Sequence, residues 1–187
     1  MLPTLFALNA AYRLAFDNWG LARNQYLQYK TEATRQAAIS ATRQLLPARN
    51  VLWKTYLQDL RAQLASDTNI ANYSQTTAYL NLETEINFLD NQDSEFSGIT
   101  SLAQAKQLSK AWESRLGKSE PLSITARTQI LSHRLDQFAS RLQPFIDSAS
   151  PSSTLDLVKQ KLGTSTPDLK KRHQLLLDVA SLMLQLP

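Results

Sequence analysis

Residues 11–65 begin with AYRLAFDNWGLARNQYLQYKTEATRQAAIS and decide how the rest of the chain can fold. Aromatic side chains recur there every seven positions, at Tyr12, Trp19 and Tyr26, with alanines in a neighbouring row. Such a repeat is typical of the contact line of a helical bundle or coiled coil. The apolar pattern resumes after Pro47. The sequence therefore predicts one long N-terminal helix, kinked at Pro47, which would span about 80 Å.

The composition favours an all-α protein. The chain has 187 residues, enough for one hydrophobic core, but only four glycines and seven prolines, fewer than the frequent turns of a β protein require. It contains no cysteine, which excludes disulfides, thiolate catalysis and zinc–thiolate sites. No run of residues is long and apolar enough for a membrane span. We expect one domain, residues 1–187, folded as an elongated antiparallel helical bundle.

Further helices should pack along the long N-terminal helix. The clearest of them carries apolar residues in heptad spacing from Tyr79 to Leu89, and another long one shows the same spacing in Ile124, Leu131, Phe138 and Phe145. The helices are expected after residue 69 and up to Gly98, at 101–116, from Pro121 to the loop at 147–153, at 154–162, and from Thr166 to the end.

Charge is distributed unevenly, although the formal total is only +4. Residues 1–66 carry eight basic and three acidic residues, residues 67–100 carry six acidic and no basic residues, and the remainder carries twelve basic and seven acidic residues. Opposite charges on neighbouring helix flanks attract each other. We therefore expect the acidic helix to fold back antiparallel on the basic N-terminal helix.

Few residues have the types and spacing that catalysis or metal binding requires. His133 and Asp136 lie one helical turn apart with Ser132 beside them, but such pairs are common on solvated helix faces. His173 falls on the apolar side of the last helix, where a histidine is more often part of a core or its boundary. Neither a metal-binding histidine pattern nor a glycine-rich phosphate loop is present. The sequence predicts no enzyme, no catalytic residue, no metal and no cofactor.

Two rows of side chains could contact a ligand or partner. The aromatic row could form a stacking platform, but its heptad spacing favours burial. Arg127, Arg134 and Arg141 also recur every seven residues. They could give weak contact with an anionic surface, or simply form a solvated flank of their helix. Nucleic-acid binding is not expected, because the basic charge is sparse and Asp136 and Asp147 dilute it.

The last helix has two neighbouring apolar faces and only a narrow polar strip. Its second face is formed by Leu175, Val179, Leu182 and Leu186. An apolar arc of this width needs burial on two sides. It lies either in a crevice between the first and fourth helices, which we favour, or at an interface with another subunit or protein.

Two stretches carry a resemblance to a known group of proteins. They are YRLAFDNWGLARNQYLQYKT at residues 12–31 and ARNVL at 48–52, continued by Tyr56-Leu57 and Leu60-Arg61. They resemble an uncharacterised group of secreted or surface helical proteins from small-genome, candidate-phylum bacteria. The resemblance covers the first half of the chain. It implies export and no particular activity.

These observations favour a structural or protein-interaction module without catalytic activity, acting at or outside the cell surface. Its partner would be a protein, either a second copy or another chain. The alternative is the helical ectodomain of a sensor or receptor that binds a small ligand between helices. An apolar pocket with a few convergent polar groups would favour this alternative.

Overall fold

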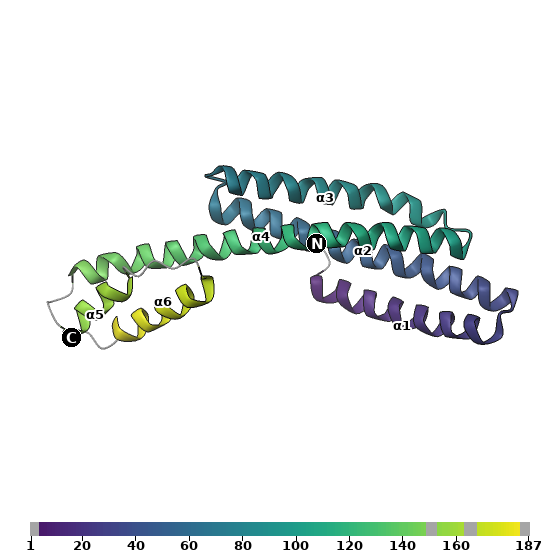
Figure 1. Ribbon diagram of the computed structural model, residues 1–187, viewed down its shortest axis with the longest axis horizontal. Helices are drawn as coiled ribbons and strands as arrows, with labels where there is room; N and C mark the ends of the chain where they lie inside the picture. Colours follow the sequence, from purple (N-terminus) through teal and green to yellow (C-terminus); the bar gives the residue numbers. More distant parts are fainter. Residues whose placement is uncertain (1–3, 149–152, 163–167, 184–187) are drawn as a thin grey trace.

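The computed structural model of the protein describes residues 4–148, 153–162 and 168–183. The prediction of an all-α helical bundle is confirmed, and Figure 1 shows that the molecule is elongated. None of the helices in these ranges combines the length and apolarity of a membrane span. The helices are α1 (Leu5–Tyr29), α2 (Glu32–Thr68), α3 (Tyr73–Ser97), α4 (Leu102–Ser148), α5 (Ser153–Leu162) and α6 (Leu169–Met183).

The predicted long N-terminal helix is instead a hairpin of α1 and α2, so the expected course of the chain is wrong here. Helix α1 ends at Tyr29, and its C-cap residue Lys30 has a left-handed φ of 51°. Thr31 then caps α2, because its Oγ1 accepts a hydrogen bond from the Thr34 amide at 3.2 Å. Pro47 lies inside α2, where the helix continues to its end. A seven-residue repeat is compatible with one long helix or with two shorter ones. Here the capping residue Thr31 starts a second helix.

Helix α3 packs antiparallel on the second half of α2, as the charge distribution predicts (Figure 1). Lys54 Nζ lies 2.8 Å from an oxygen of Asp90, and Arg61 Nη1 lies 3.0 Å from an oxygen of Glu83. The prediction is wrong for the region around Trp19, because α1 makes no contact with α3 in the described part of the chain. The acidic helix therefore pairs with α2, and through Glu85 and Arg115 also with α4, but not with α1.

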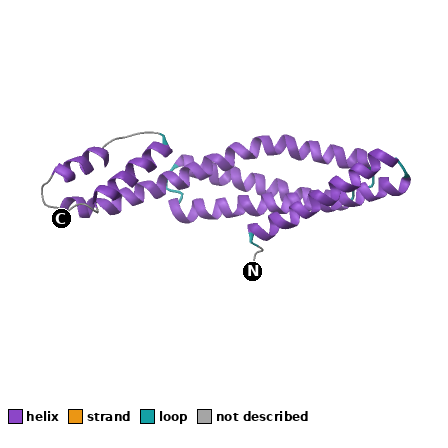
Figure 2. Cartoon of the chain, turned by 90° about the horizontal axis from the view of Figure 1, so that it is seen from below, coloured by secondary structure: helices purple, strands orange, loops and turns teal. Residues whose placement is uncertain are grey.

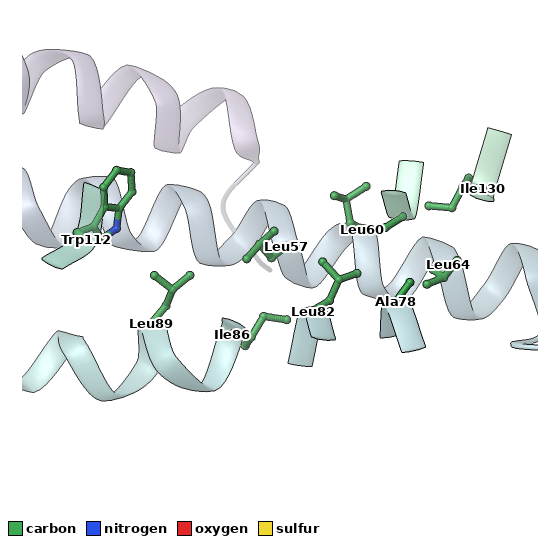
Figure 3. Close-up of a cluster of buried hydrophobic side chains, with 10 residues drawn as sticks. Leu57, Leu60, Leu64, Ala78, Leu82, Ile86, Leu89, Trp112 and Ile130 are labelled. Carbon is green, nitrogen blue, oxygen red and sulfur yellow. The ribbon is translucent and has the colours of Figure 1, made fainter. Parts of the chain in front are cut away.

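The main hydrophobic core lies between α2, α3 and residues 112–130 of α4. Figure 3 shows the leucines of α2 and α3 pointing toward one another, with Trp112 and Ile130 contributed by α4. Burial of such side chains is the main source of stability in a bundle of this kind. The buried members are Leu57, Leu60, Leu64, Ala78, Leu82, Ile86, Leu89, Trp112, Ala126 and Ile130.

Helix α4 is continuous, although the sequence predicts two helices there. Gly117 and Pro121 both lie inside it, where we expected one helix to end and the next to begin. Ser119, between them, is buried and its Oγ accepts a hydrogen bond from Trp53 Nε1 at 3.1 Å. Packing against α2 on both sides of this segment offsets the local cost of glycine in a helix, which is about 1 kcal/mol.

Helices α5 and α6 pack on the second half of α4, at one end of the molecule (Figure 2). Their side chains form a separate core with those of α4. Because α6 contacts only α4 and α5 within the described residues, the predicted crevice between the first and fourth helices is wrong. Val179 of the predicted partner face is fully buried in this core, and Leu175 and Leu182 are partly buried. Leu186 lies outside the described residues. An intermolecular role for the rest of this face stays a prediction.

Candidate functional site

Helix α1 buries little of its apolar surface. Its buried residues are Ala15 and Ala22, whereas Leu14 and Leu21 on another side of the helix are 65% and 62% exposed. The predicted burial of the aromatic row is wrong for its neighbours Phe16 and Tyr29, which are exposed. Tyr12, Trp19 and Tyr26 themselves are half-buried. The small alanines allow α1 to lie close to α2, and the aromatic rings remain accessible beside this contact.

A cleft of about 680 Å³ opens between α1, α2 and the start of α4. The α1 wall of this aromatic cleft is nearly continuous, because the ring centres of Tyr12 and Phe16 lie 6.1 Å apart and those of Phe16 and Trp19 lie 5.8 Å apart. Leu45 of α2 and Ala105 of α4 are among the apolar residues of the other walls. A concave, mostly apolar site of this size is typical of small-molecule binding.

Arg49 of α2 is the most unusual polar group in the aromatic cleft. Its guanidinium carbon lies 3.7 Å from the centre of the Trp112 ring. Its Nε and Nη2 atoms are buried and have no hydrogen-bond partner among the described residues. Burial lowers the pKa of Arg49 to about 10, while the nearby Tyr12 and Glu113 act in the opposite direction. The fold therefore holds a guanidinium beside the cleft without satisfying its buried donors.

The charges around the aromatic cleft are mainly positive. Arg23, Arg49 and Lys106 line it, and Glu113 is the single acidic residue among its lining residues. Arg23 also lies over the Trp19 ring, with 5.7 Å between its guanidinium carbon and the ring centre. An anionic ligand is therefore favoured over a cationic one.

A second candidate surface lies on the C-terminal half of α4. Its apolar row consists of Ile124, Leu131, Phe138 and Phe145, which are all exposed, although their heptad spacing predicted a core. They fall between the side of α4 that packs on α2 and α3 and the side that packs on α5 and α6. At one end the row borders a groove of about 780 Å³ between α2 and α4, whose other wall includes Tyr56 and Leu60.

The predicted arginine row flanks this apolar row. Arg134 is paired with Asp67, with 2.6 Å between Nε and Oδ2. Arg127 and Arg141 are exposed and form no ion pair with any described residue. The structure thus brings an arginine row, unpaired at Arg127 and Arg141 among the described residues, and an unburied apolar row onto one side of one helix.

In the part of the chain that the structure describes, neither histidine is arranged with a serine and a carboxylate as catalysis would require. His133 Nε2 lies 2.9 Å from the side-chain nitrogen of Gln137, and the Asp136 carboxylate is ion-paired with Arg172 of α6. Arg172 also donates a hydrogen bond of 3.4 Å to the Ser132 hydroxyl. His173 is exposed, so its predicted place in or beside a core is wrong. Among the described residues, no group of three His, Cys, Asp or Glu could hold a metal ion.

Sequence reasoning did not identify Arg49 as a site residue. A signal was present, because Leu45, Leu46 and Arg49 share one helical face with Thr42 at i, i+3, i+4 and i+7. A cation in the apolar stripe of a helix is a sign of either an ion pair or a ligand. The aromatic platform was considered, but only the hairpin of α1 and α2 turns the row into the wall of a cleft.

Comparisons with protein-family models, curated proteins and solved structures find no match for this chain. The resemblance to secreted or surface helical proteins of candidate-phylum bacteria therefore stays a prediction. The aromatic cleft and the exposed face of α4 are therefore the features that bear on function.

Proposed function

We propose that the protein is an interaction module whose exposed face on α4 binds an acidic amphipathic helix of a partner protein. The observation that carries this proposal is the coincidence of two heptad rows, one apolar and one of arginines, both exposed on one side of α4. An amphipathic helix recognises such a face through apolar side chains at positions i, i+3 or i+4, and i+7.

The dimensions of the face suit a helical partner. From Ile124 to Phe145 the apolar row extends over 22 residues, with about 32 Å between its ends at the rise of an α-helix. A partner helix of about six turns would cover it. The groove beside Tyr56 and Leu60 gives that partner a second wall at one end. Exposed apolar rows of this extent are uncommon on a monomer and mark interaction sites.

The charge of the face selects the partner. Carboxylates on the flank of a bound helix would reach Arg127 and Arg141, which form no ion pair with a described residue. A second copy of α4 laid on this face would bring one arginine row toward another, which costs energy. The apolar row and the arginines together therefore favour an acidic helix from a different protein.

Binding of designed peptides to the full chain tests this proposal. One labelled helical peptide carries leucines in heptad spacing flanked by glutamates, and a second carries lysines in place of the glutamates. Fluorescence anisotropy at about 0.15 M salt should show binding of the acidic peptide only. Replacing Phe138 and Phe145 by serine should weaken this binding by at least roughly tenfold, because it removes two large apolar side chains from the contact. The Arg127→Gln/Arg141→Gln variant should weaken it by about three- to tenfold.

The matched control is the Leu14→Ser/Leu21→Ser variant, which removes two exposed leucines from α1 and should leave peptide binding unchanged. Equal binding of the acidic and basic peptides would contradict the proposal. Light scattering that shows a dimer, lost in the Phe138/Phe145 variant, would assign the face to a second copy. Binding to anionic phosphatidylserine vesicles, lost in the arginine variant, would assign it to a membrane surface.

The aromatic cleft supports a second candidate function, a sensor or receptor domain that binds a small ligand between helices. It has the apolar walls and the convergent polar groups that this function needs. Location at or outside the cell surface and the lack of catalytic activity stay predictions. The two candidate functions use different surfaces, so that each can be tested without the other.

A further inference from the structure

We infer that the aromatic cleft binds a planar aromatic molecule that carries a carboxylate. This inference rests on the second candidate function and names its class of ligand. It does not depend on the exposed face of α4.

The α1 wall favours a flat ring system. Tyr12, Phe16 and Trp19 follow one another with ring centres about 6 Å apart, at interplanar angles of 43° and 40°. Rings spaced and tilted in this way leave their faces or edges available to a further ring, which gains from offset or edge-to-face contact. An aliphatic ligand would be buried equally well by apolar walls, but it would not use this geometry.

Arg49 supplies the anchor for the carboxylate. Its guanidinium is held over the Trp112 ring, and two of its nitrogens are buried without an acceptor. Donors left in this state cost free energy that a water molecule or a ligand oxygen recovers. The planar fork of arginine matches the two oxygens of a carboxylate. A paired contact requires the side chain to turn these two buried nitrogens toward the cleft. The cleft thus places an anion receptor beside an aromatic wall.

The other charges give the cleft its selectivity. Glu113 disfavours a second anionic group close to Arg49, because like charges repel. Arg23 and Lys106 at the lining keep the site positive overall and disfavour a cationic ring. A monocarboxylate attached to a fused or single ring system satisfies all of these conditions. A cleft of about 680 Å³ accommodates such a molecule.

Calorimetric titration of the full chain with naphthoate tests the inference, with the neutral naphthylmethanol as the matched probe. Naphthoate should bind at least about tenfold more tightly, which is the factor that one charge-assisted hydrogen bond supplies. The Arg49→Met variant keeps an apolar stem over Trp112 and should lose this preference while its circular dichroism stays unchanged. Phe16→Ala should weaken both probes by a similar factor, since it shortens the aromatic wall. Arg127→Met, an exposed arginine on α4, is the control and should change neither affinity.

The possible failures are distinct. Equal affinity for the two probes would show that the cleft binds aromatic molecules but would overturn the carboxylate. Loss of the preference in Arg127→Met instead of Arg49→Met would place the anion site elsewhere and overturn the assignment. Absence of binding by both probes would overturn the inference and also the second candidate function. Only the Arg127→Met outcome bears on the face of α4, because it would place an anion site there.

Discussion

Helices α1 and α3 have the same length of 25 residues, and each forms a hairpin with α2, yet they are held in different ways. Helix α3 buries eight residues, among them Leu82, Ile86 and Leu89, and adds ion pairs to α2. Helix α1 buries only two alanines and keeps its aromatic residues accessible. The comparison separates a helix that stabilises the fold from one whose side chains are available to a ligand.

The largest expected difference between the two hairpins is in core packing. Leu82→Ala in α3 removes a fully buried side chain and should lower the free energy of unfolding by about 2 to 5 kcal/mol. Leu21→Ala in α1, at a 62% exposed position, should change it by less than about 0.5 kcal/mol. Urea unfolding followed by circular dichroism measures both values. Similar losses in the two variants would contradict the distinction between α1 and α3.

The second test concerns the ion pairs of α3. Glu85 is nearly buried and holds Arg115 of α4 through two contacts, of 2.6 Å to Nη2 and 2.9 Å to Nε. Glu85→Gln leaves the partly buried guanidinium without its counter-charge and should cost about 2 kcal/mol. Glu83→Gln removes a more exposed pair with Arg61 and should cost less than about 1 kcal/mol. If the two variants unfold at the same urea concentration, burial does not govern the strength of these pairs.

For α1, the sharpest test is Trp19→Ala. The indole is half-buried at the aromatic cleft. We therefore expect the free energy of unfolding to fall by about 1 to 2 kcal/mol, which is less than the roughly 3 to 5 kcal/mol lost when a fully buried tryptophan is replaced by alanine. Thermal unfolding, together with naphthoate binding to the same variant, shows whether the residue serves the ligand more than the fold. A loss as large as that of Leu82→Ala would assign the aromatic row to the core.

The smallest expected change in stability is that of Arg49→Met, and it is an increase where the other variants give a decrease. Arg49→Met replaces a cation with unsatisfied buried donors by an apolar side chain that still covers Trp112. The free energy of unfolding should rise by about 1 kcal/mol, because the free-energy cost of the unpaired donors exceeds the stabilisation from the cation–π contact. A gain in stability combined with a loss of naphthoate binding is typical of a residue kept for function. Destabilisation instead would indicate that Arg49 serves mainly to hold Trp112.

Much of the fold could be predicted because its signals are local or depend on charge. The left-handed cap at Asn69, the end of α3 at Gly98 and the pairing of α3 with α2 all follow from residue types at known positions. The hairpin at Lys30 was missed because the seven-residue apolar spacing continues past it, from Tyr26 to Ala33. The capping residues Thr31 and Thr34 carried the signal, but a threonine within a long apolar pattern is ambiguous.

The continuity of α4 and the candidate sites were harder to predict for a different reason. Gly117 and Pro121 disfavour a helix locally, and only the contacts with α2 and α3 override them. Phe138 and Phe145 have the spacing of a core, but whether a heptad row meets a partner depends on where the other helices end. The sequence specifies which side chains share a face. It does not specify what that face meets.

The continuity of α4 also has a mechanical consequence. A single helix of 47 residues is about 70 Å long and runs from the bundle that contains the aromatic cleft to the pair formed by α5 and α6 (Figure 1). It is a rigid spacer, since an α-helix that packs against other helices at both ends bends far less than a flexible linker of the same number of residues. A ligand in the cleft and a partner on the far half of α4 would therefore be held at a fixed separation and orientation.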